Sequence, residues 1–266
     1  MKIEPLLKSD IASLPELQPE DWNDIVPAFK YHLSNSFSHG MKFCDGNKLV
    51  AVGVTIIHGP VAWLAQIIVH PDYRSKGIGY QLTNELLITA EKFNCSTVLL
   101  LATPLGYPVY LKHGFVAEDT YSFYRSEKLW KDAIENPFLR PYSKVFRKQI
   151  QVLDLKAAGE NRNFRLDEFL DDAVLFVESN VVKGYFLPRF GEGLVVASEM
   201  EAGLTLLKHR LQFRHEVVIP DLNLIASQFL IENNYSVFRT AVRMRKGNPI
   251  HPDLAMVYAR ISGQIG

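Results

Sequence analysis

The segment IIVHPDYRSKGIGYQL, residues 67–82, joins an apolar strand to an amphipathic helix through a loop that carries two glycines. Gly77 and Gly79 lack a side chain, so the main chain of the loop can approach a ligand closely. A helix that begins near Gly79 directs unpaired N–H groups and a partial positive charge toward the loop. The segment therefore predicts a site for an anion, of the kind that holds a pyrophosphate.

The flanking residues place this loop at the end of a strand. Residues 61–69 form a nearly continuous apolar run, which is typical of a strand buried on both faces. Residues 96–102 are a second such run, and between the two runs apolar residues recur at helical spacing, at Leu82, Leu86, Ala90 and Phe93. Ligands commonly bind at this point of an α/β sheet. The loop matches neither common nucleotide-binding glycine spacing, so a tight glycine turn in an unrelated α/β protein stays an alternative.

The combined pattern resembles the GNAT superfamily of N-acetyltransferases over residues 41–124. The signature of that family, Q/R-x-x-G-x-G/A, is filled by Arg74, Gly77 and Gly79. The resemblance implies that the loop holds the pyrophosphate of acetyl-CoA, while the preceding strand binds the pantetheine arm and the thioester carbonyl. The residues that the resemblance assigns to acetyl-CoA are Ile67, Ile68, Val69, Arg74, Ser75, Lys76, Gly77, Ile78, Gly79 and Tyr80.

Residues 102–115, ATPLGYPVYLKHGF, are similar to the closing motif of the family, in which a short helix carries a tyrosine four residues before a Gly-Phe pair. Pro108 suits the first helical turn and Gly114 suits a left-handed stop. The resemblance implies that Tyr110 protonates the departing thiolate. Because a phenol titrates near 10 and a thiol near 8.5, that transfer is uphill by about 1.5 units, or roughly 2 kcal/mol. An alternative of equal weight is that Tyr110 only packs beneath the coenzyme and forms a hydrogen bond.

The chemistry implied is direct attack of an amine on the thioester in a ternary complex, without an acyl-enzyme and without a metal. No residue stands out as the base that takes the proton of the amine. His70 and His113 can titrate near neutrality, yet each occupies a place where a surface or helix-end histidine is ordinary. Cys44 and Cys95 form no CxxC pair and are interpreted as free thiols.

Composition sets the class of protein. The chain has 266 residues, which suggests two domains, and 47% of them are apolar. The formal charge is zero and the pI is about 7.1, so neither nucleic acid nor an anionic membrane is an expected partner. The first ten residues lack the apolar core of a signal peptide, and no apolar run reaches the roughly 20 residues of a membrane span. We expect a cytoplasmic protein, either a monomer or a homodimer.

The predicted fold class is α/β, or α+β, with a mixed central sheet flanked by helices in tandem acetyltransferase-like domains. Residues 1–127 form the N-terminal acetyltransferase domain in this prediction, residues 128–149 a polar and basic linker, and residues 150–266 a degenerate C-terminal domain of the same kind. In the first domain we expect a strand near Ile3, helices across residues 11–33, and a hairpin that turns at residues 45–47. Residues that either line the acceptor side or only pack there are Tyr31, His32 and Phe37.

The second half repeats the first in a weaker form. A shift of about 120 residues, typical of one domain, aligns residues 217–219 with residues 97–99. Leu230 then falls where Tyr110 stands, and Asn234 replaces Gly114. Residues 194–199, which align with the glycine loop, have no glycine and no cation. Candidate substrate contacts, for which a stabilising role is the favoured interpretation, are Tyr185, Arg189, Phe190 and Arg239.

The sequence thus predicts an acetyl-CoA-dependent N-acetyltransferase that acts on the amine of a small molecule or amino-acid-like acceptor. One alternative is a regulatory module that binds acetyl-CoA without turning it over, and the lack of an evident base keeps this alternative open. Another is acetylation of a protein lysine or N-terminus, which the neutral charge and a second domain that narrows the cleft both disfavour.

Overall fold

The structure, a computed structural model, describes residues 2–20 and 22–265. The chain forms two compact units, and each unit combines segments that are far apart in the sequence. The first unit extends to Ala117 and also includes Met244–Pro249 and Ile265, while the second comprises Glu118–Arg243 and Ile250–Gln264. The linear domain limits expected from the sequence stay a prediction.

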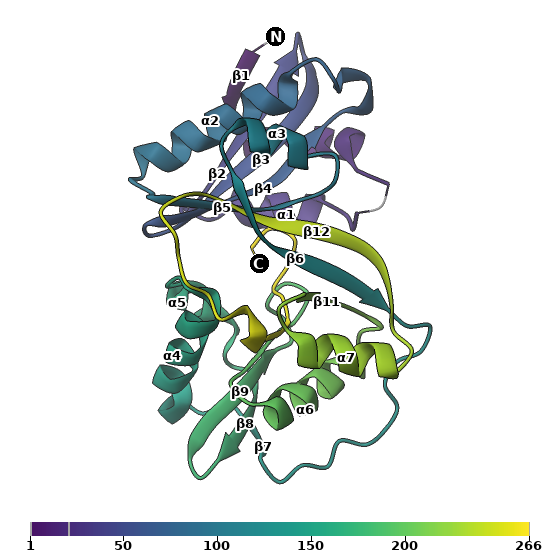
Figure 1. The fold of residues 1–266 in the computed structure, drawn as a ribbon. Coiled ribbons are helices and arrows are strands. Elements are labelled where there is room, and N and C mark those ends of the chain that lie inside the picture. The colour runs from purple at the N-terminus through teal and green to yellow at the C-terminus, as the bar shows by residue number, and fades with distance from the viewer. Residues whose placement is uncertain (1, 21, 266) are drawn as a thin grey trace. The chain divides into compact units, whose positions relative to one another are not determined.

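The sheet of the first unit has the strand order β1-β2-β3-β4-β5 (Figure 1). The first four strands pair antiparallel, whereas β4 and β5 are parallel, so the sheet is mixed. Gly46, with φ +58°, takes the left-handed conformation in the hairpin turn, at the place that the sequence predicts. The strands are Lys2–Pro5 (β1), Ser38–Asp45 (β2), Lys48–His58 (β3), Val61–Val69 (β4) and Thr97–Ala102 (β5).

Helices cover both faces of this sheet. Thr55 in β3 donates a hydrogen bond to the carbonyl of Leu86 in α2, so its side chain points toward α2. The neighbouring Val54 points to the opposite face and pairs with Gly40, which packs against Leu33 at the end of α1. The region expected as helices across residues 11–33 holds a 3₁₀ helix, which contains a proline, and one short α-helix. The helices are Lys8–Leu17 (η1), Val26–His32 (α1), Pro71–Tyr73 (η2), Ile78–Lys92 (α2) and Tyr107–Lys112 (α3).

A strand from the end of the chain completes the first unit. Strand β12, Ser236–Gly247, leaves the second unit after Arg243, and its last residues lie beside β5. There the N–H of Asn248 donates to the carbonyl of Ser96 at 2.9 Å, and the Thr97 hydroxyl donates to the carbonyl of Asn248 at 2.8 Å. In return, β6, Val116–Arg125, passes into the second unit after Ala117. Each half of the chain thus contributes a segment to the unit that the other half mainly forms.

The second unit contains an antiparallel sheet of order β13-β10-β9-β8-β7, and a further strand, β11, that pairs with β6. Residues 128–149, expected as a linker, contribute β7 and the start of α4 to this unit. The strands are Leu139–Pro141 (β7), Val174–Glu178 (β8), Val181–Leu187 (β9), Leu194–Ala197 (β10), Glu216–Pro220 (β11) and Val257–Ala259 (β13). The helices are Lys144–Phe146 (η3), Arg147–Ala158 (α4), Asn163–Leu166 (α5), Asp167–Phe169 (η4), Met200–Leu211 (α6), Leu224–Glu232 (α7) and Leu254–Met256 (η5).

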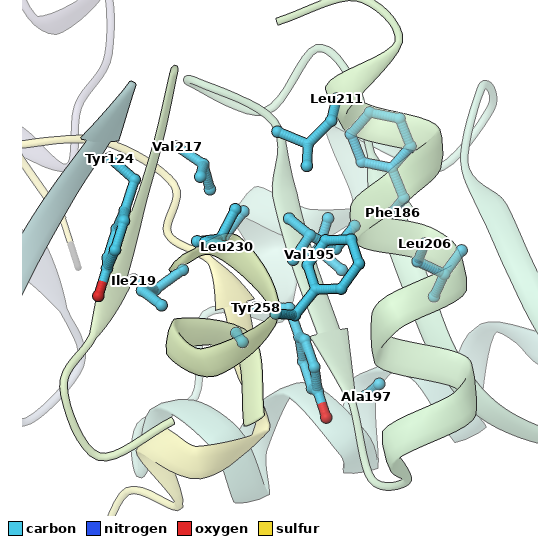
Figure 2. Packing of buried hydrophobic residues seen from close by; sticks show 14 of the residues in the cluster. Tyr124, Phe186, Val195, Ala197, Leu206, Leu211, Val217, Ile219, Leu230 and Tyr258 are labelled. Atoms are coloured by element: carbon cyan, nitrogen blue, oxygen red, sulfur yellow. The ribbon is translucent and has the colours of Figure 1, made fainter. Parts of the chain in front are cut away.

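The core of the second unit lies among β10, β11, α6 and α7. Figure 2 shows Leu230 of α7 and Tyr258 of β13 in the same apolar cluster as Val195 and Ile219. Gly203 in α6 has no side chain at the point where the Tyr258 ring packs, and a Cβ there would lie only 2.1 Å from the ring. The predicted fold class, a mixed sheet flanked by helices in a tandem architecture, is confirmed. Within residues 2–20 and 22–265, no helix has both the length and the apolar character needed to cross a membrane.

Candidate active site

Strand β4 parts from β5 soon after the two strands meet. They pair in parallel at only three positions, from Val61 opposite Thr97 to Trp63 opposite Leu99. On its other side, β4 carries a β-bulge, because Ala65 lies opposite Val54 while Ile68 lies opposite Val52. In the part of the chain that the structure describes, the pairing with β5 is not resumed along residues 64–69, so this edge keeps main-chain groups for another partner.

The predicted phosphate loop follows directly. Ser75 and Gly77 both have positive φ, +61° and +80°, and Gly77 is the N-terminal cap of α2. Among the described residues, no main-chain N–H from Ser75 to Tyr80 has an internal acceptor, and the first such bond runs from Gln81 to the Gly77 carbonyl. Left-handed residues at the start of a helix gather main-chain donors into an anion-binding concavity. The arrangement suits a pyrophosphate.

Two cations border this loop. The Arg74 Nε donates to the Val69 carbonyl at 3.2 Å, and the Lys76 Nζ donates to the Asp72 carbonyl at 2.8 Å. Lys76 also lies 4.8 Å from the centre of the Tyr73 ring. Both side chains are exposed, so they add positive charge at the rim of the loop while their positions are held by local contacts.

Tyr110 lies in α3 and is buried, at 8% exposure. Its ring packs against Gly106, where any Cβ would lie 2.8 Å from the ring, and meets Phe115 edge-on at 6.0 Å between centroids. Burial raises the pKa of the Tyr110 hydroxyl above its usual value near 10. The hydroxyl therefore stays protonated at neutral pH and can donate a hydrogen bond.

His113 ties the Tyr110 helix to the phosphate loop. Its Nε2 lies 3.0 Å from the Tyr80 carbonyl, and the two rings stack at 4.0 Å. Because a carbonyl only accepts, that Nε2 must carry a hydrogen. Burial lowers the pKa of the His113 imidazole, and the carbonyl of His113 accepts from the Nζ of Lys246 in β12 at 2.6 Å. These contacts give His113 a structural role.

His70, the other candidate base, lies at the far end of the loop. Its Nδ1 accepts from the N–H of Asp72 at 3.2 Å, which leaves that nitrogen engaged in the turn before the phosphate loop. Both cysteines are free thiols.

The predicted acceptor-side residues are partly structural. His32 is buried, with its Nδ1 3.1 Å from the Ser38 hydroxyl, whereas the Tyr31 and Phe37 rings lie 6.2 Å apart and keep some exposure. In the second unit, Tyr185 and Phe190 are both buried. Tyr185 donates to the carboxylate of Asp154, and Phe190 stacks on Phe169. Of the other two candidates, Arg189 pairs with Asp172 and Arg239 lies over the Phe123 ring.

Gln66 is not among the site residues predicted from the sequence. This residue is buried within β4, has a φ of +52°, and its Oε1 has no hydrogen-bond partner among the described residues. A single amide inside the apolar run of residues 61–69 is the signal that could have found it.

The comparisons with known proteins agree with this geometry. Residues 4–115, which include the loop and Tyr110, match the model of the acetyltransferase (GNAT) family. This part of the chain is a GNAT acetyltransferase domain. The GNAT resemblance read from Arg74, Gly77 and Gly79 is thereby confirmed, and the family match supports acetyl transfer as the general activity. A comparison with curated protein sequences gave no match.

Solved structures extend the likeness beyond the GNAT domain to the whole chain. A putative acetyltransferase from Pyrococcus horikoshii is similar with a TM-score of 0.85 and 21% identity, covering 100% of this chain and 95% of that one. A GCN5-related N-acetyltransferase from Sphaerobacter thermophilus gives 0.64 and 13%, covering 94% and 97%. A tandem GNAT protein from the clavulanic acid biosynthesis pathway gives 0.60 and 14%, covering 93% and 99%. At these identities the likeness shows a shared two-domain fold.

Proposed function

We propose that the protein is an acetyl-CoA-dependent N-acetyltransferase that acts on a small molecule or amino-acid-like amine. The observation that carries this proposal is the run of main-chain N–H groups from Ser75 to Tyr80, which have no internal acceptor among the described residues and lie at the start of α2. Such donors, with the cations Arg74 and Lys76 at the rim, fit a pyrophosphate. The edge of β4 at Ile67, Ile68 and Val69, which does not pair with β5, fits an extended pantetheine arm that hydrogen-bonds as a strand would, except at the Val69 carbonyl, which already accepts from the Arg74 Nε.

Different residues of the chain contribute to different parts of the proposed acetyl transfer. The β4 edge and the loop hold the two substrates close together, which accounts for much of the rate. An N–H of the Ile67–Val69 segment stabilises the negative charge that develops on the thioester oxygen. Bound acetyl-CoA supplies an activated acetyl group. The amine nitrogen attacks the thioester carbon, the carbon–sulfur bond breaks, the sulfur leaves as the thiolate of CoA, and the proton of the amine passes to water.

Tyr110 acts on the leaving sulfur. Its raised pKa makes full proton transfer to a thiolate less favourable than for an ordinary phenol, because a thiol titrates near 8.5. The hydroxyl is nevertheless always available to donate a hydrogen bond, which lowers the energy of the thiolate as it forms. This reading gives Tyr110 a role in catalysis whether or not the proton is transferred.

The test measures release of free thiol from acetyl-CoA, with and without a panel of primary amines that includes spermidine, kanamycin and a short peptide with a free N-terminus. We expect amine-dependent thiol release with a small amine, and one equivalent of CoA bound per chain by calorimetry. Binding without turnover would favour the regulatory module instead. Turnover of the peptide alone would favour a protein acceptor, and no binding of CoA would refute the proposal.

A further inference from the structure

Gln66 combines two unfavourable features in one residue. Its side chain is buried at 9% exposure, yet its Oε1 has no hydrogen-bond partner within residues 2–20 and 22–265. Buried amide oxygens in folded proteins almost always have a partner, because leaving one unpaired costs free energy. An unpaired buried oxygen in the middle of an apolar strand therefore requires an explanation.

The main chain of Gln66 is also strained. Its φ of +52° is in the left-handed region, which a residue with a Cβ seldom adopts and which glycine or asparagine adopts more readily. The cause is the β-bulge, in which Gln66 and Ile67 together lie opposite the single residue Gly53. Strained main-chain conformations are concentrated at functional sites, where the surrounding structure maintains them.

The location of Gln66 connects these features with the proposed reaction. It lies three residues beyond Trp63, where β4 and β5 last pair, and directly before the segment Ile67–Val69 proposed to hold the thioester. We infer that Gln66 binds the amino group of the acceptor through Oε1, an inference that rests on the proposed N-acetyltransferase function. The bound amine supplies the hydrogen-bond donor that the amide oxygen lacks.

An uncharged amide suits this task chemically. The acceptor must lose a proton before its nitrogen can attack, and a carboxylate beside it would stabilise the ammonium form and raise its pKa. The Gln66 oxygen accepts an N–H without adding charge, so it positions the amine without holding its proton. The chemical class that this favours is a small primary amine that enters the site with its nitrogen first.

A pair of variants on adjacent strands separates this role from a structural one. Gln66→Met keeps the length of the side chain and the strained main chain but removes the amide. The matched control is Thr55→Val, because Thr55 is also buried but its hydroxyl already donates a hydrogen bond to the Leu86 carbonyl at 3.0 Å. We expect Thr55→Val to lower the Tm by a few degrees and to leave the KM for the amine unchanged.

For Gln66→Met we expect the reverse. The Tm stays the same or rises, since a buried unpaired oxygen is removed, while the KM for the amine from the panel rises by on the order of tenfold or more. The Kd for CoA, measured by calorimetry, stays the same. Because Gln66 does not titrate, the pH dependence of kcat/KM keeps its shape, and a shifted profile would overturn the inference.

Gln66→Asn is the second variant, and it decides the question if Gln66→Met does not fold. Asparagine tolerates the left-handed conformation and keeps an amide oxygen on a shorter side chain. We expect a higher Tm with a KM between those of the wild type and Gln66→Met. If the wild type releases no thiol with any amine of the panel, the proposed function fails and this inference fails with it. If the wild type is active and both Gln66 variants keep its KM, only the role of Gln66 is refuted.

Discussion

In the first unit, residues 70–77 separate β4 from α2, whereas in the second unit only Ser198 and Glu199 separate β10 from α6. The long connection contains two left-handed residues and a series of main-chain N–H groups without internal acceptors among the described residues. The short one brings the chain directly from strand to helix and contains no glycine. The same succession of strand and helix therefore provides a loop with unpaired main-chain donors in one unit and only a short connection in the other.

The strand edges differ as well. In the second unit, β13 pairs with β10, with Val195 opposite Ala259 and Val196 opposite Val257. The residue after β13, Arg260, donates its N–H to Val218 in β11 at 3.0 Å. The chain thus bonds to itself along the edge that β4 leaves unpaired in the first unit. We infer that the second unit is a degenerate acetyltransferase fold that binds no acetyl-CoA.

Helix α3, which carries Tyr110, and helix α7, which carries Leu230, end with the same main-chain hydrogen bond but differ in the side chain at this position. The N–H of Phe115 donates to the Tyr110 carbonyl at 3.1 Å, and the N–H of Tyr235 donates to the Leu230 carbonyl at 2.9 Å. Leu230 is completely buried in the core of its unit (Figure 2). Tyr110 carries a hydroxyl, whereas Leu230 contributes only apolar packing, so the second unit keeps the helix ending but lacks the group that we propose acts in catalysis.

The largest effect is expected from separating the two halves. A chain of residues 1–127 lacks 244–249, which hydrogen-bond to Ser96 and Thr97 at the edge of β5. An unpaired edge in a sheet of this size favours unfolding or aggregation. We expect this fragment to show no cooperative thermal transition by circular dichroism. Joining residues 236–249 to it through a flexible linker should restore the transition, and a fragment that folds and binds CoA unaided would show that residues 244–249 are dispensable.

Tyr110→Phe should have the next largest effect. Removal of the hydroxyl that we propose acts on the leaving sulfur should lower kcat by about 10²-fold or more at saturating acetyl-CoA. Leu230→Met is the matched control in the second unit, because a conservative core change costs little stability and touches no proposed site. Steady-state kinetics of both variants test the difference between the units. Equal kcat values for Tyr110→Phe and the wild type would remove Tyr110 from the mechanism.

A smaller effect is expected at Gly77, where the main-chain conformation, and not the space around the residue, limits which side chains are tolerated. Its φ is +80°, and a Cβ there would have only the Gln81 Nε2 nearby, at 3.9 Å. Gly77→Val should weaken CoA binding by about tenfold, because a β-branched residue disfavours this conformation. Gly77→Asn, which tolerates it, should keep the Kd within about threefold of the wild type. Calorimetry measures both.

The control for Gly77 is Gly46, which has a similar φ of +58° in a hairpin turn with open space around it. Gly46→Val should lower stability without changing the Kd for CoA. A similar loss of affinity in both valine variants would mean that general destabilisation, and not the loop, sets the affinity.

Local sequence patterns predicted the elements that depend on neighbouring residues. The apolar runs gave β4 and β5, the glycine loop gave the start of α2, and the Gly-Phe pair gave the end of α3. The left-handed conformation at Asn234, with φ +64°, followed from its place after a helix. In each case the signal and the structure lie within a few residues of each other.

Long-range pairing could not be predicted in this way. Nothing in residues 236–247 indicates that the end of this strand lies beside β5, because a strand pattern does not identify its partner. The bulge at Gln66 depends on the register between β3 and β4, and the placement of β13 on β10 depends on residues about 60 positions away. The features that distinguish the two units, apart from the glycine loop and Tyr110, therefore emerge only in three dimensions.

The smallest effect is expected from exchanging the two helix stops. Gly114 and Asn234 follow α3 and α7 with φ of +81° and +64°, and both residue types tolerate this region. We expect Gly114→Asn and Asn234→Gly each to change the free energy of unfolding by less than about 1 kcal/mol, measured by urea denaturation. A Cβ at 114 would lie 3.5 Å from the Lys246 Nζ, an ordinary contact, so conformation alone decides the result. Gly114→Val should be clearly more destabilising, by about 1–2 kcal/mol. If Gly114→Asn lowered the free energy of unfolding as much as Gly114→Val, the end of α3 would require glycine for a reason other than the left-handed conformation. Asn234 at the end of α7 would not share that requirement, and the two units would then differ in their scaffolds as well.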